Sequence, residues 1–416
     1  MAREGFIGRW MRTLGYRALC SVVNQPILLR AVARLLRERP PLAAAAKVVV
    51  TRDDVAAVFD RQALFSSIAH QPNLVAGPFV ISAESGPSQT AQRRGLEACL
   101  ASPREFGIQA ALASRDRIMP LRPGPVRRLD VTTDYMVPIA WACLRSCFGT
   151  ALPDLASSDP LFAHLRHIGA HLIVGGAATQ AVQERAVQSA IAVDAWIRPH
   201  LPQIRAARQA GPDVTDDELA RDAVGLLWVG HPASVQALAL IVLDLIRRPQ
   251  WRVLAARAEQ CLGPDAAGDP WDDAGLRSDV QAHVLESLRF RPPFPLLLRY
   301  VVRDGHMGSR PPRKVAARDS IRLLVLGAMF DPAAHVDPAS AERYCPARKW
   351  RDPDDRELMF GIGPRPCIAR EHVLEMLTSA LIGLLLLPGP TLADPFWARF
   401  RIDGPAITRL RLRFGS

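Results

Sequence analysis

Cys367 ends a short glycine-bearing run, residues 360–367, with the sequence FGIGPRPC. Gly361 and Gly363 permit left-handed backbone and a close approach to a flat ligand. The apolar segment after the run is typical of a helix, whose N-terminal amides stabilise a thiolate. Arg365 can form a charge-assisted pair with a carboxylate. The pattern therefore predicts a loop that presents Cys367, with a lowered thiol proton affinity, to a flat ligand.

This run resembles the haem-binding loop of cytochromes P-450. Phe360, Gly363, Arg365 and Cys367 match fixed positions of that loop, and Ala369 stands where glycine is commoner. The resemblance implies haem b (iron protoporphyrin IX) with Cys367 as the axial ligand of the iron. The thiolate of such a site donates electron density to the iron and favours cleavage of an O–O bond.

Two further motifs follow the family's order along the chain. Glu286 and Arg289 resemble the ExxR pair, three residues apart on one side of a helix. Arg343, in a segment that also contains Pro346 and Arg348, resembles the arginine of the PERF meander. The resemblance implies that Glu286, Arg289 and Arg343 form a buried ionic triad, which specifies the fold around the cofactor.

Three arginines match positions that bind the haem propionates. Arg93 lies in the segment 85–94, which resembles the start of a helix that contacts haem, and Gln89 replaces the usual histidine there. Arg299 follows Pro292 and Pro293 on a predicted strand. With Arg365, these residues are expected to pair with the two carboxylates, because guanidinium geometry suits carboxylate oxygens.

The central helix departs from the family pattern. The family places an acid and an alcohol after a glycine, and this pair relays protons to oxygen. Here Gly230 is kept, but Pro232 and Ala233 stand at the acid and alcohol positions and can donate no proton. His231 and Ser234 are the remaining candidates, with Gly230, for catalytic roles on this helix.

Several activities are compatible with that departure. The first is a monooxygenase that hydroxylates or epoxidises a hydrophobic small molecule such as a lipid, terpenoid or polyketide. A peroxide-using peroxygenase and a peroxide-rearranging isomerase or dehydratase are alternatives, and a haem-binding sensor is the non-enzymatic one. The expected pocket segments, residues 65–81, 162–182 and 294–298 with the central helix, are mostly apolar. The candidate polar groups of this pocket are His70, Asn73 and Gln180.

The elements that must position these residues can be read from the sequence. Thr215 and Glu218 form a capping box that begins a long helix, which Pro249 stops after Arg248. A last apolar helix is predicted at about residues 368–387. We expect a helix at 53–60 and strands at 46–51, 296–302 and 320–325.

These elements describe a mainly α (α+β) fold, which the resemblance identifies as the helix-rich triangular prism of cytochromes P-450 with a small β-sheet region. No repeat or linker divides the chain. We therefore expect residues 1–416 to form a single domain, with a basic N-terminal segment, residues 1–40, packed on it. That segment holds eight arginines and two glutamates, and as a basic amphipathic stretch it could instead touch a membrane surface.

The charge and cysteine content narrow the partners and the compartment. The net charge is +11, but no nucleic-acid motif accompanies it, so we expect no nucleic-acid partner. A ferredoxin or flavin reductase remains a possible redox partner. Seven widely spaced cysteines favour a reducing, cytoplasmic location. The uncharged run 223–243 is read as a buried helix rather than a transmembrane anchor, and we expect a monomer.

Overall fold

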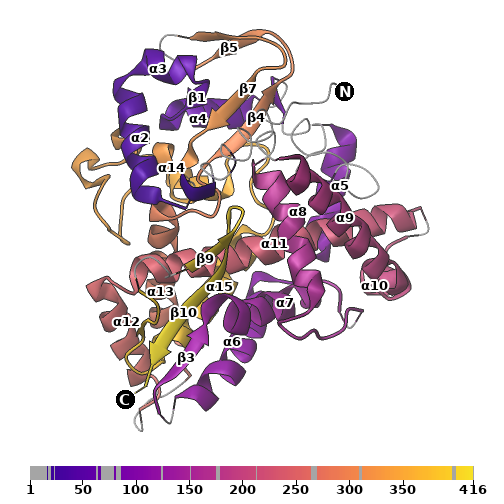
Figure 1. The fold of residues 1–416 in the computed structure, drawn as a ribbon, viewed down its shortest axis with the longest axis vertical. Helices are drawn as coiled ribbons and strands as arrows, with labels where there is room; N and C mark the ends of the chain where they lie inside the picture. The colour runs from indigo at the N-terminus through magenta and orange to yellow at the C-terminus, as the bar shows by residue number, and fades with distance from the viewer. Residues whose placement is uncertain are drawn as a thin grey trace. The chain divides into compact units, whose positions relative to one another are not determined.

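The computed structural model describes most of the chain in two compact units (Figure 1). The described residues are 16, 20–22, 24–61, 64–66, 79–80, 86–122, 125–149, 151–174, 179–211, 213–263, 269–308, 312–395 and 400–415. Unit 1 comprises Met1–Gly95, His167–Asp194 and Phe294–Ile368. Unit 2 comprises Leu96–Arg166, Ala195–Pro293 and Ala369–Ser416. The expectation of one domain over residues 1–416 stays a prediction.

Unit 1 is built around a four-stranded sheet with the strand order β1-β7-β4-β2. Its strands are β1 Val48–Val49, β7 Ser320–Leu323, β4 Leu297–Val301 and β2 Phe65–Ser66. β1 pairs with β7 in parallel, and the other two pairings are antiparallel. A separate hairpin joins β5 Gly305–Met307 to β6 Arg313–Val315. The strands predicted at 46–51, 296–302 and 320–325 are thus confirmed in shorter form.

Short helices and turns complete unit 1. The predicted helix at 53–60 is α4 Arg52–Asp60, capped by Thr51, whose side chain accepts from the Asp54 amide. Helix α2 Pro26–Glu38, which precedes α4 in the chain, packs on α14 Val325–Met329. The helices are α2 Pro26–Glu38, α3 Pro40–Ala45 and α14 Val325–Met329, and the 3₁₀ segments are η6 Pro332–Ala334, η7 Pro338–Ser340 and η8 Pro353–Phe360. Three helices run from one unit into the other: α5 Pro87–Cys99, α8 Pro160–Val174 and α9 Gln180–Ile197.

Unit 2 is mainly helical and has its core around α15 Arg370–Leu385. That helix is the predicted last apolar helix, and it contacts α6, α13 and α11. The helices of this unit are α6 Pro103–Ile118, α7 Val137–Ser146, α10 Leu201–Ala207, α11 Asp216–Leu245, α12 Pro249–Gln260, α13 Ala274–Phe290 and α15, with the short turns η2 Met119–Leu121 and η5 Arg198–His200 and the π-helical η3 Val131–Met136.

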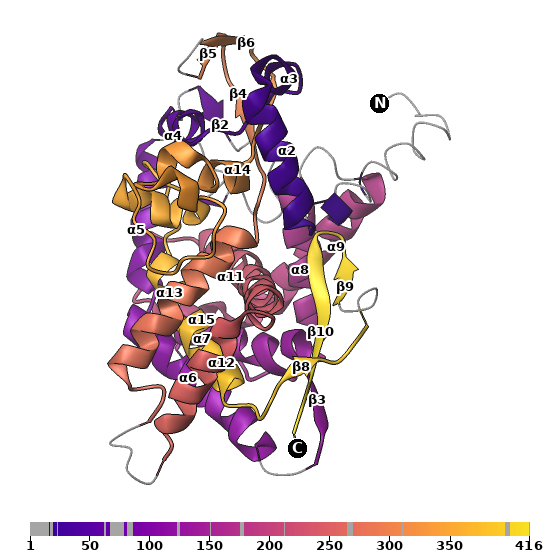
Figure 2. The same cartoon turned by 90° about the vertical axis from the view of Figure 1, so that its left-hand side faces the viewer.

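A small antiparallel sheet closes unit 2 at the end of the chain. β10 Ala406–Phe414 pairs with β3 Arg127–Asp130, with β8 Thr391–Leu392 and with β9 Phe400–Asp403. Figure 2 shows β9 beside the long β10. Helices with small peripheral sheets confirm the predicted α-rich α+β class.

The long central helix α11 begins where the sequence predicts. Thr215 Oγ1 accepts from the Glu218 amide at 3.2 Å, and a Glu218 carboxylate oxygen accepts from the Thr215 amide at 2.9 Å. This capping box is confirmed. The helix ends at Leu245, three residues before the predicted end, and Pro232 lies inside it. Among the described helices, α11 is the one long and apolar enough to cross a membrane, but 72% of its most apolar window is buried.

The contact between α6 and α15 depends on Gly383. A Cβ atom at this position would overlap Ser114 Oγ and the Tyr135 hydroxyl. Those two hydroxyls lie 2.6 Å apart, and the Tyr135 hydroxyl donates to the Ala380 carbonyl at 2.6 Å. A hydrogen-bonded pair from α6 and η3 thus sits directly on the backbone of α15.

We expect Gly383→Ala to lower the free energy of unfolding by about 1–3 kcal/mol, because the added methyl group must displace buried hydrogen-bonded atoms. The measurement is urea unfolding followed by circular dichroism. Gly95→Ala is the matched control, since a Cβ atom there meets nothing within 4 Å. That substitution should stabilise α5 by about 0.5–1 kcal/mol. Equal effects of the two substitutions would contradict this account of the α6–α15 contact.

Candidate functional site

The Cys367 loop is closed by its own backbone. The Cys367 amide donates to the Phe360 carbonyl at 2.8 Å, where η8 ends. Gly361 has φ 79° and ψ 153°, a combination that is accessible essentially only to glycine. Gly363 has φ 73°. Phe360 is half-buried and the Cys367 side chain is exposed, so the loop presents its thiol outward.

Arg93, Arg299 and Arg365 come together beside this loop in unit 1. Arg93 Nη1 on α5 donates to the Pro366 carbonyl at 2.9 Å, next to Cys367. Burial, and then the neighbouring Arg365, lower the pKa of Arg299 from 12.5 to about 10. Burial and the nearby Arg93 likewise lower the pKa of Arg365. The sequence predicted these three arginines as one group, and the structure brings them together.

Burial is the main cause of the lowered pKa of both Arg299 and Arg365, and a neighbouring arginine is the second cause. Arg299 Nη1 donates to the Leu298 carbonyl at 2.8 Å, and its guanidinium lies 5.4 Å from the centre of the Phe59 ring. Arg365 is half-buried. Like charges held together in this way favour an anionic ligand. Gln89, one helical turn before Arg93 on α5, is buried at 8% exposure.

Unit 2 holds the predicted Glu286–Arg289 pair on α13. Arg289 donates to the two carboxylate oxygens of Glu286 at 2.9 and 3.0 Å, and both residues are at most 5% exposed. The pair is therefore bidentate and buried. Removing one partner of such a pair lowers the stability of the fold because the other charge stays buried.

The structure does not bury Arg343 as the sequence analysis expected. Its side chain is 68% exposed and pairs with Asp337 at 2.9 Å. Arg348 is the inward arginine of this segment, since it is half-buried and donates to the Ser340 carbonyl, to Ser340 Oγ and to the Arg343 carbonyl. The Pro-x-Arg spacing of the meander motif occurs at Pro346-Ala347-Arg348, so the arginine of the motif corresponds to Arg348 and not to Arg343. That spacing could have identified Arg348 from the sequence.

No motif in the sequence indicates Arg52, which lies on α4 and supports the loop. Arg52 Nε donates to Asp355 at 2.7 Å, and Nη2 donates to Asp352 at 2.6 Å. Asp355 is 1% exposed, and burial raises its pKa although Arg52 opposes this. The network holds η8, which leads into the Cys367 loop. Its members lie about 300 residues apart in the chain, too far for a motif to connect them.

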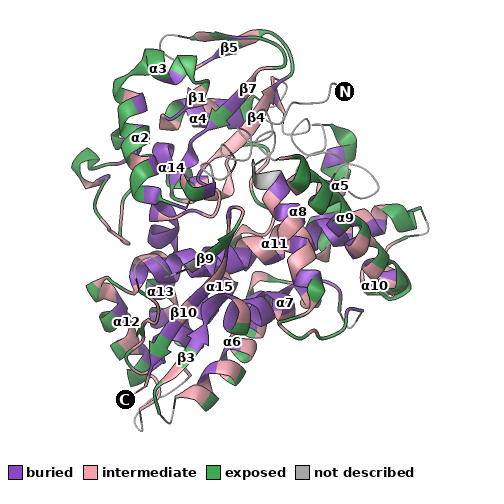
Figure 3. Cartoon of the chain, in the orientation of Figure 1, coloured by how far each residue is buried: buried purple, intermediate pink, exposed green. Residues whose placement is uncertain are grey.

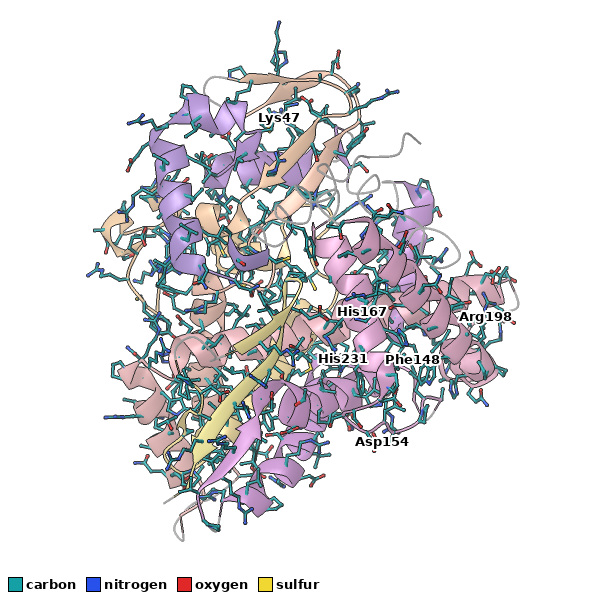
Figure 4. The ribbon with its side chains drawn as sticks, in the orientation of Figure 1. Lys47, Phe148, Asp154, His167, Arg198 and His231 are labelled. Carbon is teal, nitrogen blue, oxygen red and sulfur yellow. The ribbon has the colours of Figure 1, made fainter. Side chains whose placement is uncertain are left out.

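The candidate catalytic residues of α11 are engaged within unit 2. His231, labelled in Figure 4, is 1% exposed. Its Nε2 lies 3.1 Å from the Val137 carbonyl, and its ring stacks on Phe162 at 4.6 Å between centroids. Ser234 Oγ donates to the Gly230 carbonyl at 2.7 Å. A Cβ atom on Gly230 would lie 3.0 Å from Leu144 Cδ2, so glycine permits close packing of α11 on α7. The catalytic roles of the three residues stay predictions.

The partly exposed positions in the middle of α11 are apolar. Val229, Pro232 and Ala233 are intermediate in exposure and lie three and four residues apart, on one face of the helix. Of the predicted polar groups of the pocket, Gln180 is exposed and donates to Glu184 at 2.7 Å. His70 and Asn73 lie outside the described residues.

Comparisons with known proteins agree with this arrangement. The sequence profile of the family "Cytochrome P450" matches residues 180–379. The open structure of cytochrome P450 EryK from S. erythraea has a TM-score of 0.70 and 21% identity, covering 94% of this chain and 96% of that one. These matches support the cytochrome P450 superfamily for this chain.

Other similar proteins match a smaller part of the chain or at lower identity. Human cytochrome P450 4F2 is 26% identical over 194 residues, which cover 44% of this chain and 36% of that protein. Mouse leukotriene-B4 omega-hydroxylase 3 is 25% identical over 186 residues, which cover 42% and 34%. The chain thus spans about a third of the length of these curated relatives. P450BioI, solved with a fatty-acyl carrier protein, has a TM-score of 0.68 at 16% identity, covering 88% of this chain and 92% of that one.

The cofactor that P450 membership implies is haem b. The residues of unit 1 fit it. Haem b carries two carboxylates, and the three clustered guanidinium groups are suited to them. The exposed Cys367 thiol on a glycine-bearing loop suits an axial ligand. Cys367 would hold the iron, and Arg93, Arg299 and Arg365 would hold the carboxylates.

Acid should destabilise the protein through His231. Burial, reinforced by Arg166 and opposed by the bond to Val137, lowers the pKa of His231 from 6.5 to about 4. The unfolded chain therefore binds a proton between pH 6.5 and 4 that the folded chain does not, and the stability present above pH 6.5 is lost as the pH falls to 4. The loss should reach about 3 kcal/mol.

Urea unfolding across this pH range measures the effect. His231→Gln should flatten the pH dependence, while the half-exposed His200→Gln serves as the control and should leave it as in the natural protein. An unchanged slope in His231→Gln would show that other groups cause the acid sensitivity.

Arg299→Leu should weaken haem retention about ten- to a hundredfold, the usual effect of losing a hydrogen bond to a charged group. The measurement is the rate of haem transfer to apomyoglobin. The exposed Arg303→Leu is the matched control and should keep the natural rate. Because removal of one like charge relieves repulsion, Arg299→Leu should not destabilise the haem-free protein. Equal haem loss from both variants would remove Arg299 from the site.

Proposed function

We propose that this protein is a haem-thiolate monooxygenase that hydroxylates or epoxidises a hydrophobic small molecule. The observation that carries the proposal is the cluster of Arg93, Arg299 and Arg365 beside the outward thiol of Cys367. When bound through a thiolate, haem supplies activated oxygen for insertion into unreactive bonds. The protein's own residues bind and orient this group through the thiolate and the guanidinium groups.

The proposed substrate is a hydrophobic molecule, of lipid, terpenoid or polyketide type. In support, the half-exposed face of α11 formed by Val229, Pro232 and Ala233 is apolar. The names of two similar proteins also point to hydrophobic molecules, one a leukotriene-B4 omega-hydroxylase and the other an EryK variant solved with erythromycin B. An apolar lining binds such molecules by burying their surface.

Proton delivery is the step in which this chain differs from its family. Pro232 and Ala233 have no proton to give, and the Ser234 hydroxyl is already donated to the Gly230 carbonyl. His231 is buried, contacts the Val137 carbonyl and has a pKa near 4, which makes it a poor acid–base group at neutral pH. We therefore propose that ordered water or a hydroxyl group of the substrate delivers the protons.

The same observations favour a second candidate, a peroxygenase that takes oxygen from a peroxide. Such an enzyme needs neither an electron partner nor the standard proton relay. An isomerase or dehydratase acting on a substrate peroxide would likewise need no external electrons. A haem-binding sensor would give no product with any oxidant.

For the monooxygenase we propose a ferredoxin or a flavin reductase as electron donor, a cytoplasmic location and a monomeric state. Exposed basic residues near the Cys367 loop in sequence suit an acidic partner: Arg343, Lys349, Arg351 and Arg356. The nearby acidic residues reduce the positive charge of this segment less than their number suggests. Asp355 is buried, and both Asp352 and Asp355 bind Arg52. Electrostatic docking of this kind weakens as salt rises.

The test compares reductase with O₂ against a hydroperoxide, on one substrate and with products identified. In the natural protein, product per electron consumed should be low with generic substrates. Pro232→Glu combined with Ala233→Thr should raise coupled product formation at least about tenfold, because general acid help is worth about 10²–10⁴-fold. Peroxide-driven turnover should stay the same or fall.

Pro232→Gln with Ala233→Val is the matched control, because it has the same sizes without the acid or the hydroxyl, and it should not improve coupling. Tight coupling by the natural protein on several unrelated substrates would reveal a hidden relay. Product from hydroperoxide alone would support the peroxygenase, and a rearranged hydroperoxide without oxygen transfer the isomerase.

A further inference from the structure

Helix α2 has two apolar faces. Leu29, Ala33 and Leu36 are at most 7% exposed and form the inner face, consistent with the packing of α2 on α14. Ile27, Leu28, Val32 and Leu35 are 70%, 47%, 37% and 45% exposed. At about 100° per residue, these four fall within an arc of about 140° on the other side of the helix. Packing within unit 1 therefore explains only one of the two faces.

The neighbouring helix α3, which contacts α2, also exposes an apolar side chain. Leu42 is 48% exposed, and Pro40, Pro41 and Ala44 beside it are also exposed. Figure 3 shows both helices with exposed residues in green. We call Ile27, Leu28, Val32, Leu35 and Leu42 the α2–α3 apolar face. Single exposed apolar residues are ordinary, but five within sixteen residues of chain form a patch that indicates an interaction surface.

A row of arginines borders this face. Arg30, Arg34 and Arg37 are spaced four and three residues apart, so they share one side of α2 between its inner and outer faces. Arg30 and Arg34 lie 3.6 and 3.1 Å from the carboxylate of Glu342, while Arg37 donates to the Gly327 carbonyl. Arg39 is exposed at the end of the helix. With eight arginines against two glutamates in the first forty residues, the region stays strongly positive.

The composition of the face distinguishes between occupants. All five side chains are aliphatic, whereas protein interfaces concentrate aromatic residues and methionine at their centres. An apolar helix face bordered by arginines is the arrangement of helices that lie in the plane of a membrane interface. Anionic lipid headgroups complement the arginines, and the cytoplasmic leaflet is rich in such lipids.

We propose that the α2–α3 apolar face docks this protein on an anionic bilayer surface. The aliphatic side chains would enter the boundary between headgroups and acyl chains, and the exposed Arg34 and Arg39 would contact phosphates. The inner face of α2 meanwhile stays packed on α14. This attachment is peripheral and reversible, and it is independent of the proposed oxygenase chemistry.

The test is flotation of the full-length protein with vesicles of phosphatidylcholine alone, or with about 30% phosphatidylglycerol added. The natural protein should bind the anionic vesicles and detach in about 0.5 M NaCl. Leu28→Gln with Val32→Thr and Leu35→Gln should reduce binding at least about tenfold, because it removes the aliphatic contacts and leaves every charge in place. Circular dichroism checks that this variant is folded, as expected for substitutions at exposed positions.

Ile108→Gln with Leu112→Gln on α6 is the matched control, because these residues are 42% and 49% exposed and lie four residues apart on another helix. This variant should bind vesicles like the natural protein. Absence of binding by the natural protein, or equal binding by the triple variant, would overturn the proposal. A concentration-dependent dimer that the triple variant abolishes would also overturn it and assign the face to a second copy of the chain. None of these outcomes depends on turnover, so they leave the oxygenase proposal untouched.

Discussion

The close approach of three guanidinium groups is the feature of unit 1 on which the candidate site depends. Arg93, Arg299 and Arg365 come from a helix, a strand and a loop, and burial together with a neighbouring arginine lowers the pKa of Arg299 and of Arg365. A cluster of this kind is unfavourable until an anion joins it. A ligand that binds only the folded chain adds its binding free energy to the stability. The haem carboxylates would therefore stabilise the fold as well as position the cofactor.

Features that depend on neighbouring residues in the chain were predictable from the sequence. The start of α11 follows from Thr215 and Glu218, whose reciprocal hydrogen bonds need only a three-residue spacing. The Glu286–Arg289 pair forms for the same reason on α13. The Cys367 loop was also predictable, since its two glycines adopt the left-handed backbone that their positions suggested. Local geometry decides each of these features.

Features that depend on distant contacts were not predictable in the same way. The segment around Arg343 is irregular, so periodicity does not distinguish the outward Arg343 from the inward Arg348, and only the Pro-x-Arg spacing at Pro346 and Arg348 indicates the inward one. His231 has the chemistry of an acid–base residue, but the Val137 carbonyl, 94 residues away, and the ring of Phe162 hold it in a buried environment. Residue type indicates what a side chain is able to do, and its tertiary neighbours decide whether it remains available.

The backbone closure of the Cys367 loop has a consequence for the way the cofactor is acquired. The amide of Cys367 is fixed on Phe360, and Arg93 fixes the carbonyl of Pro366. Protein contacts alone thus set the shape of the loop. Preorganised loops lose little conformational entropy when a ligand arrives, so ligand binding is not opposed by the cost of ordering the chain. Haem would then bind to a loop that is already ordered. The rate of uptake would be set by access of the porphyrin to unit 1 and not by folding of the loop.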